Sequence, residues 1–263
     1  MKKIIMVLTL TLFFLHIFAF DELWQKAQVI AENSWKLVPG ITTLEMFTIS
    51  ENADNISAGM EIKMLHYLGE DGTIVTEVIK AEMTIDEGEM PEIEDDEDFF
   101  ISEEDLAEFL IEDFHQPDDF DDAAIAMANE MSKDMIPKRS GMFFETNTRN
   151  LSVKRMNETK TINGRLCQGF EIRYSASGKR RDREEGTVWL EINTGAPVMA
   201  EMSPNSTPMF TRSINIETHY GFNDDTKQFF REKVINNAEI SVLRIRMNMI
   251  TTIMNENYWE FHM

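Results

Sequence analysis

The side chains most able to do covalent chemistry are one cysteine and four histidines that follow residue 20. Cys167 could act as a nucleophile if folding placed His66 or His219 beside it as a base. The other two, His115 and His262, are equally isolated in the sequence. No G-x-S-x-G, H-E-x-x-H, glycine-rich phosphate loop or paired C-x-x-C surrounds any of them. The sequence therefore predicts a protein that is not an enzyme and needs no cofactor, with a Cys–His dyad as the alternative.

Calcium binding is the second chemistry to consider, because acidic residues are concentrated in one segment. Nineteen Asp and Glu residues, and no Lys or Arg, lie between Asp86 and Asp122, within a chain of net charge −22. The densest part, Asp95 to Phe100, lacks the glycine that an EF-hand loop needs at its sixth position. We interpret the segment as a solvated linker and helix faces, and we predict no metal site. The net charge argues against nucleic acid and against anionic membrane surfaces as partners.

Methionine is unusually frequent, with 19 residues in the chain. Many of them fall on expected strands or helix stripes. Because methionine is unbranched and adaptable, it suits a surface that binds varied apolar partners. The alternative is that these methionines fill an ordinary core. Cys167, which follows Leu166 in a strand-like run, is expected to be a buried thiol, and one cysteine excludes an internal disulfide.

The first 19 residues have the pattern of a secretory signal peptide. Lys2 and Lys3 precede an apolar run from Ile4 to Phe18, and Ala19 offers a small residue for cleavage. The apolar run is short for a transmembrane helix, and no cysteine follows that could be lipidated. We therefore expect export to the periplasm through a cleaved signal, not a lipoprotein, with residues 20–263 forming a single domain.

The elements nearest the N-terminus are predicted from periodicity. Apolar residues at three- and four-residue steps predict a helix from Asp21 to Val38, which Pro39-Gly40 would stop. Strand-like runs follow at Thr43–Ser50, Met60–Leu68 and Thr73–Ile85. In the second run Met60, Ile62 and Met64 share one face. In the third, a period of two places Val75, Ile79, Ala81, Met83 and Ile85 together.

An acidic helical insertion, 86–140, interrupts the strands. Residues 86–98 form a charged linker. A helix beginning near Ser102 carries an apolar stripe of Leu106, Phe109, Leu110 and Phe114. A second helical pattern from Pro117 runs through Ala124, Met127, Ala128, Met131 and Met135. Both stripes need a partner surface, so we expect these helices to pack on the sheet.

The strand pattern resumes near residue 142 and continues to the C-terminus. Candidate strands are Met142–Thr148, Leu151–Glu158, Leu166–Ser175, Thr187–Ile192, Val198–Met202, Arg212–Phe222, Phe229–Val234 and Ala238–Met254. These elements predict a fold that is mainly β with helices (α+β), built on an antiparallel sheet long enough to curl.

The order of these elements resembles the periplasmic lipoprotein-carrier superfamily, which includes LolA/LolB-like carriers and receptors and related sigma-factor regulators. The resemblance rests on the helix ending in Leu37-Val38-Pro39-Gly40, the three-strand meander, the helical insertion, and the hairpin GTVWLEINTGAP at 186–197. It implies a strongly curved antiparallel sheet forming an incomplete barrel, with the N-terminal helix and two inserted helices covering its open side. The acidic segment is longer and more charged than the carrier pattern, which favours a specialised relative.

The resemblance also implies that acyl chains bind between the sheet and the helices. We therefore predict a lipid- or lipoprotein-binding carrier or chaperone in outer-membrane lipoprotein sorting, with an inner-membrane transporter as donor and an outer-membrane acceptor. Candidate wall residues lie on apolar strand faces: Met60, Ile62, Met64, Val75, Ile79, Met83, Phe170, Ile172, Val188, Leu190, Ile245 and Met247. Phe109 and Met131 are the candidate lid residues.

Two alternatives remain at this point. Each wall residue could instead pack in an ordinary core. If the register were reversed, the residues on the other face of its strand would line the cavity. The whole protein could be a non-enzymatic protein-interaction or stress-regulatory module, with a solid core and the acidic segment as its docking site. A continuous apolar cavity of several hundred cubic ångströms would separate the carrier from the interaction module.

Overall fold

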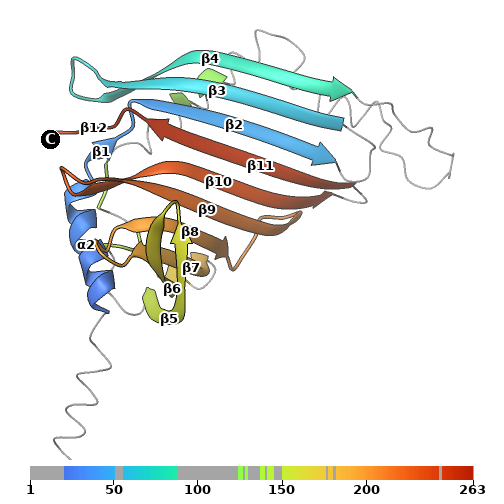
Figure 1. Ribbon diagram of the computed structural model, residues 1–263. Coiled ribbons are helices and arrows are strands. Elements are labelled where there is room, and N and C mark those ends of the chain that lie inside the picture. Colours follow the sequence, from blue (N-terminus) through green and yellow to red (C-terminus); the bar gives the residue numbers. More distant parts are fainter. Residues whose placement is uncertain are drawn as a thin grey trace, which may run out of the picture. The chain divides into compact units, whose positions relative to one another are not determined.

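The computed structural model describes residues 21–50, 56–87, 124–126, 128–129, 137–139, 141–144, 150–175, 177–179, 182–242 and 245–262 (Figure 1). The chain divides into two compact units. Unit 1 comprises Met1–Ser34, Arg139–Asn205 and Tyr220–Phe229; unit 2 comprises Trp35–Lys138, Ser206–His219 and Phe230–Met263. The predicted signal peptide, the acidic run 95–100 and the helix expected from Ser102 lie outside the described residues.

Ten strands form one sheet in the order β4-β3-β2-β11-β10-β9-β8-β7-β6-β5. Their bounds are β2 Ile41–Ser50, β3 Ile56–Leu68, β4 Ile74–Glu87, β5 Leu151–Ile162, β6 Arg165–Ser175, β7 Arg183–Glu191, β8 Pro197–Pro204, β9 Thr211–Asn223, β10 Gln228–Val242 and β11 Ile245–Glu256. Each pairing with a described register is antiparallel. Because β4 and β5 are its two edges, the sheet is not closed into a barrel. The predicted fold class is confirmed.

Helix α2, Glu22–Ser34, packs one apolar face into unit 1. Asp21 caps its first turn, because its carboxylate accepts a hydrogen bond from the Leu23 backbone N–H at 2.9 Å. The helix ends four residues before the predicted Val38. Leu37 and Val38 form the short strand β1, which pairs with β12, Trp259–Glu260. A long-range pairing therefore ends the helix before Pro39-Gly40 can.

The hairpin of β7 and β8 has the turn that the sequence predicts. Gly195 has a φ of +80°, a conformation that glycine adopts without steric cost. The Thr194 hydroxyl donates to the Glu191 carboxylate at 2.7 Å and accepts from the Ala196 N–H at 3.1 Å. A Cβ on Gly195 would lie 2.5 Å from Cβ of Lys26 on α2. The glycine therefore allows both the turn and the close approach of the helix.

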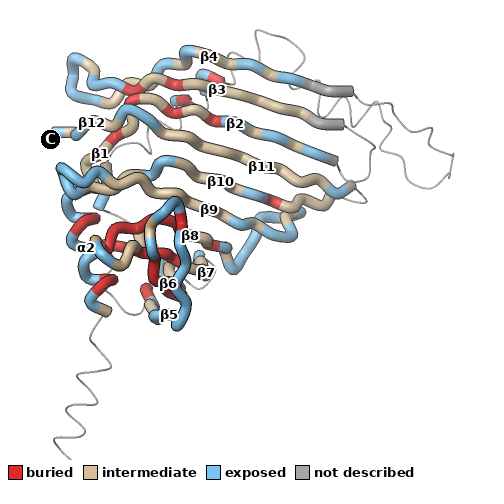
Figure 2. Tube along the Cα trace, in the orientation of Figure 1, coloured by how far each residue is buried: buried red, intermediate tan, exposed pale blue. Residues whose placement is uncertain are grey.

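The core of unit 1 lies between α2 and strands β5 to β8. Trp24 is fully buried, with its ring centroid 5.2 Å from that of Phe143 and 5.7 Å from that of Phe170. Figure 2 shows the buried residues of this unit on α2 and on β6, β7 and β8. A smaller cluster uses other side chains of the same strands: Ile162, Cys167, Trp189, Val198 and Met199. Both faces of the β7–β8 hairpin therefore carry buried apolar residues.

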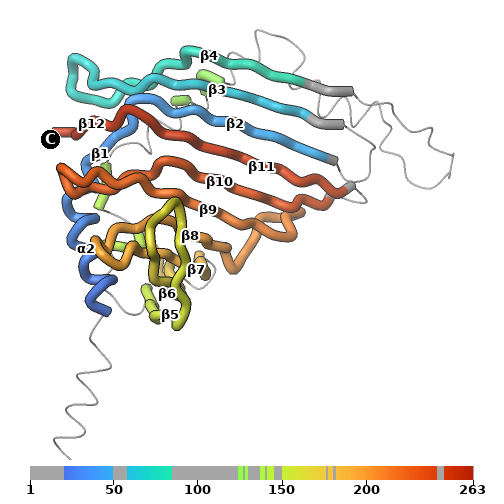
Figure 3. Tube along the Cα trace, viewed as in Figure 1, coloured from blue at the N-terminus to red at the C-terminus, as the bar shows by residue number. Residues whose placement is uncertain are grey.

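Three predicted strands, Met142–Thr148, Phe229–Val234 and Ala238–Met254, differ from the structure. Residues 142–144 form a turn, not the beginning of a strand. The predicted strand Ala238–Met254 is two strands, β10 and β11, which lie side by side with Ala238 opposite Met249 (Figure 3). The break expected after Val234 is absent, because β10 runs on through Asn236. The chain reverses near Val242 without a glycine, proline or asparagine to signal it.

Candidate functional site

The candidate site is one face of the sheet in unit 2. Residues directly opposite each other on antiparallel strands point to the same face. Ile62 of β3 lies opposite Leu44 of β2 and Ala81 of β4. Leu44 also lies opposite Ile253 of β11. Leu44 and Ile62 are 5% and 1% exposed, so this row is the buried centre of the face.

Methionines continue this face on both sides of the central row. Met60 lies opposite Met46 and Met83, which makes a row of three methionines across β2, β3 and β4. On β11, Met249 lies opposite Thr48 and Met247 lies opposite Ser50, so both belong to the same face. Among the described residues, the face carries six methionines: Met46, Met60, Met64, Met83, Met247 and Met249. We call this surface the methionine face. Met64 is fully buried and the other five are partly exposed.

A β-bulge in β4 corrects the predicted faces of two residues. Lys63 lies opposite Lys80 but Met64 lies opposite Val78, so Ile79 is an extra residue in β4. Beyond the bulge the alternation reverses. Val78 therefore joins Ala81 on the methionine face, and the prediction that Val75 and Ile79 share that face with Ala81 and Met83 is wrong.

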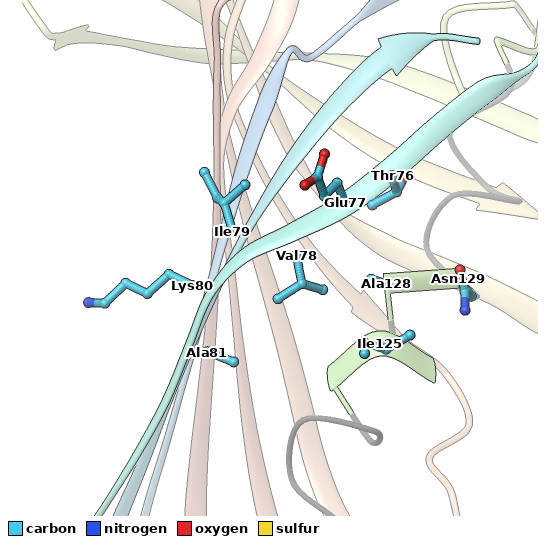
Figure 4. A pocket seen from close by; sticks show the side chains of 9 residues that line it. All are labelled: Thr76, Glu77, Val78, Ile79, Lys80, Ala81, Ile125, Ala128 and Asn129. Carbon is cyan, nitrogen blue, oxygen red and sulfur yellow. The ribbon is translucent and has the colours of Figure 1, made fainter. Parts of the chain in front are cut away.

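The reversal is visible in the side chains. Val75 lies opposite Tyr67, on the other face of the sheet, and Ile79 is 50% exposed. In Figure 4, Val78 and Ala81 point to the side of the helical segment, whereas Ile79 points away from it. A period of two cannot show an inserted residue, so the sequence gave no signal for this change.

A helical segment covers part of the methionine face. Residues 124–126 and 128–129 are helical. Ala124 and Ala128 are each 2% exposed and belong to the same buried cluster as Leu44, Ile62 and Met64. The prediction that this helix packs on the sheet is confirmed for these two alanines. Ile125 is 50% exposed, while Met131 lies outside the described residues.

A groove lies between β4 and this helical segment. Its volume is about 470 Å³, and its lining is Thr76, Glu77, Val78, Ile79, Lys80, Ala81, Ile125, Ala128 and Asn129. Figure 4 shows these side chains. The volume falls within the range of small-molecule sites in proteins. Five of the nine residues are apolar, so the groove can take an apolar group beside polar ones.

Polar residues bound the methionine face at one end. His66 lies opposite Thr76, and its Nδ1 is 3.0 Å from the Thr76 hydroxyl. The Thr42 hydroxyl donates to the Asn255 side-chain oxygen at 2.9 Å. Burial lowers the pKa of His66 from 6.5 to about 4, so the imidazole is neutral at pH 7. The face is thus polar near Thr76, which lines the groove, and apolar along the methionine rows.

The candidate residues of unit 1 have a different environment. Phe170, Ile172, Val188 and Leu190 are at most 1% exposed and form one cluster with α2 side chains. The helix, together with Phe143, fills the space over this part of the sheet. Lipid contact by these four residues stays a prediction, and their present partners are the side chains of a packed core.

The structure therefore brings Met60, Ile62, Met64, Met83 and Met247 onto one face. Ile245 begins β11 on the same alternation, but its side chain and Phe109 lie outside what the structure describes. Sequence reasoning missed several members of the face: Thr42, Leu44, Met46, Val78, Met249 and Ile253. The alternation of Thr42, Leu44 and Met46 was a usable signal. The contribution of Val78 depends on the bulge.

The residues considered for catalysis have other partners. The Cys167 thiol donates to the Arg165 carbonyl at 3.3 Å, and burial raises its pKa, so the thiolate is disfavoured. His66 is bonded to Thr76, and His219 to Glu217. Among the described residues, no group of three or more His, Cys, Asp or Glu side chains could hold a metal ion.

No family model matches the chain, nor does any curated protein. Among solved structures, it is similar to a domain from Vibrio parahaemolyticus described as an outer membrane lipoprotein-sorting protein, with 11% identity and a TM-score of 0.36, over 90% of this chain and 91% of that one. A LolA superfamily protein from Nitrosomonas europaea matches with 10% identity and a TM-score of 0.36, over 90% and 94% of the two chains.

A chain of the Pseudomonas aeruginosa MucA/MucB complex also matches, with 6% identity and a TM-score of 0.28, over 92% of this chain and all of that one (100%). At these identities and scores the similarity concerns the fold and assigns no function.

In the part of the chain that the structure describes, no helix combines the length and apolar character needed to cross a bilayer.

Proposed function

We propose that this protein is a non-enzymatic binding protein that shelters the acyl chain of a lipid or an acylated protein against the methionine face. One observation carries the proposal: a groove of about 470 Å³ lies at the edge of this face, under a helical segment anchored by Ala124 and Ala128. Methionine side chains adapt to apolar ligands of varied shape because they are unbranched and have three rotatable bonds.

The described contacts of the helical segment are small beside what an acyl chain can gain on the same face. A 16-carbon chain that leaves water buries ~15 methylenes, worth roughly 12 kcal/mol in total. The two described anchors are methyl groups, which together contribute about 2 kcal/mol by the same measure. A chain that takes their place on Ile62 and Met64 gains more than the alanines lose. The helical segment is therefore suited to act as a lid.

The polarity of the face fits an amphiphilic ligand. Thr76 and His66 lie at one end, where a polar head group finds hydrogen-bonding partners. The methionine rows extend from there along the strands, where an acyl chain finds apolar ones. We infer that the head group lies near Thr76 and the chain lies along Met64, Ile62 and Met60.

The finer part of the proposal concerns location and partners. Residues 1–19 have the pattern of an export signal, which supports a periplasmic site of action. An acyl chain moved between membranes through the periplasm needs a donor, a soluble carrier and an acceptor. We propose the carrier role for this protein, with an acylated lipoprotein or a free lipid as cargo.

Native mass spectrometry of the mature protein, purified from a bacterial periplasm, tests the proposal. We expect a stoichiometric acyl lipid or lipopeptide, identified after solvent extraction. Val78→Trp fills the groove and is expected to remove the ligand. Thr84→Trp is the matched control, since Thr84 is an exposed residue of β4 next to Met83 and on the other face.

Two results would refute the carrier. One is a wild-type mass without bound ligand that stays unchanged when lipids are supplied. The other is equal ligand loss in Val78→Trp and Thr84→Trp. The filled core of unit 1 favours the second candidate function, a protein-interaction or stress-regulatory module. In that case a basic partner should bind the acidic segment 86–122, with an affinity that falls as salt is added.

A further inference from the structure

We propose that the methionine face selects lipids whose polar group is uncharged, with the imidazole of His66 as the hydrogen-bonding partner of that group. The ligand class is an acyl chain in ester or amide linkage, in contrast to an ionised fatty acid. This selectivity rests on the proposed function, because it names the chemistry of the lipid that the same face would bind. Two kinds of observation carry it: polar atoms on the face that have no partner, and the charges around the face.

His66 has one ring nitrogen without a partner. Its Nδ1 lies 3.0 Å from the Thr76 hydroxyl, whereas its Nε2 is buried and is bonded by none of the described residues. The side chain is 2% exposed and lies on the methionine face, one strand inward from Thr76, which lines the groove. A buried polar atom without a partner destabilises a protein, so a ligand that bonds to Nε2 recovers that free energy.

The neutral ring can bond to an uncharged group in either tautomer. Because burial lowers the pKa of His66 to about 4, the imidazole carries a single N–H at pH 7. If the Thr76 hydroxyl donates to Nδ1, then Nε2–H donates to an ester or amide carbonyl. If Nδ1–H donates to Thr76, then Nε2 accepts from a hydroxyl or an amide N–H. A monoacylglycerol offers both a carbonyl and hydroxyls, so it satisfies either tautomer.

A second polar atom on this face also lacks a partner. Asn236 of β10 lies opposite Thr251 of β11, which lies opposite Met46, so the Asn236 side chain shares the methionine face. Its Oδ1 is buried, and none of the described residues donates to it. An amide oxygen accepts a hydrogen bond from a hydroxyl or an N–H and repels an ionised carboxylate, which is an acceptor only. This part of the face is therefore suited to an uncharged group as well.

The face offers no cation to an ionised lipid. Wherever their side chains are described, the residues that the strand register places on it, from β2, β3, β4, β10 and β11, are uncharged. Along β10, alternation adds Glu232, two residues before Val234, and this residue is acidic. The described residues of the helical segment are uncharged, and the nearest charged residues in the sequence, Asp122 and Glu130, are acidic.

The two charged residues that line the groove do not change this balance. The register places Lys80 and Glu77 on the other face of β4. The Lys80 ammonium is 2.9 Å from the Glu61 carboxylate and 3.0 Å from the Glu82 carboxylate. In Figure 4 its side chain points away from the helical segment. A carboxylate buried against the methionine face would therefore have no cation beside it, which costs far more free energy than burying an ester or an amide.

Displacement of a neutral fluorescent probe, N-phenyl-1-naphthylamine, from the delipidated mature protein tests this selectivity. The competitors are 1-monopalmitoylglycerol and palmitate at pH 8, both below their micelle-forming concentrations. They carry the same acyl chain and differ in the charge of the polar group. We expect the glyceride to displace half of the probe at a concentration on the order of tenfold lower than palmitate.

Val78→Lys is the decisive variant, and Val78→Gln is its matched control. Val78 lies on the methionine face and lines the groove. A lysine supplies the missing cation, so the preference for the glyceride should fall about tenfold, whereas glutamine should leave the ratio of the two affinities near the wild-type value. His66→Phe keeps a ring but removes both nitrogens, and it should weaken binding of the glyceride about fivefold more than binding of palmitate.

The possible failures are distinguishable. Equal displacement by the two lipids from wild type, or an unchanged ratio in Val78→Lys, would overturn the selectivity and leave the proposed carrier in place. Displacement by neither lipid would overturn both. Melting temperatures verify that each variant is folded, and the wild-type ratio tests the selectivity without any variant.

Discussion

The buried imidazole of His66 predicts a specific loss of stability in mild acid. His66 is 2% exposed, and none of the described residues bonds its buried Nε2. Burial lowers its pKa to about 4 in the folded state, whereas the unfolded value is 6.5. Above pH 6.5 the imidazole is neutral in both states, and its contribution to stability is fully present. As the pH falls below 6.5, the unfolded state takes up a proton that the folded state refuses, so stability is lost down to about pH 4.

The size of this loss follows from the two values. A difference of about 2.5 between 6.5 and 4 corresponds to about 3 kcal/mol at 1.36 kcal/mol for each pH unit. Below about pH 4 the folded imidazole is protonated as well, and His66 causes no further loss. His66→Gln keeps a hydrogen-bonding partner for Thr76 but has no proton to gain. We expect the unfolding free energy of wild type, measured relative to that of His66→Gln, to fall by about 3 kcal/mol between pH 7 and pH 4.

Urea unfolding followed by far-ultraviolet circular dichroism at a series of pH values measures this difference. Carboxylates titrate over the same range, but they are common to both proteins and cancel in the comparison. Parallel pH profiles for the two proteins would refute the reasoning, because they would mean that His66 is hydrated or partnered in the folded state.

Two further predictions concern unit 1. Leu190→Ala, at a fully buried position, should cost about 2–5 kcal/mol of unfolding free energy, whereas the half-exposed Leu166→Ala should cost less than about 1 kcal/mol; equal melting temperatures for the two variants would contradict the packed core beneath α2. The Cys167 thiol, buried and with a raised pKa, should react with a disulfide reagent only after unfolding; rapid modification of the native protein would show that the thiol is accessible.

Local patterns predicted those elements that local physics controls. The helix α2 follows from Leu23, Trp24, Ala27 and Ala31, because their spacing places them on one side of a helix. The β7–β8 hairpin follows from alternation and from Gly195, whose conformation few other residues adopt. In both cases the signal lies within a few residues of the structure that it predicts.

Other features depended on partners distant in the sequence. The helix ends at Ser34 because Leu37 and Val38 pair with Trp259 and Glu260. The run from Ala238 to Met254 folds back on itself, although no glycine, proline or asparagine lies between Val242 and Ile245 to mark the reversal. The extra residue at Ile79 reverses the faces of β4, and alternation alone cannot show it.

The candidate site shows the same division. By itself, the sequence determined that Met60, Ile62 and Met64 share one apolar face and that Val188 and Leu190 share another, because successive side chains on a strand point to opposite sides. Only the tertiary structure decided what covers each face. The first lies under two alanines beside a groove, and the second lies under the aromatic residues of α2 and its neighbours. An apolar pattern requires that a face be covered, and contacts between residues distant in the sequence determine which segment covers it.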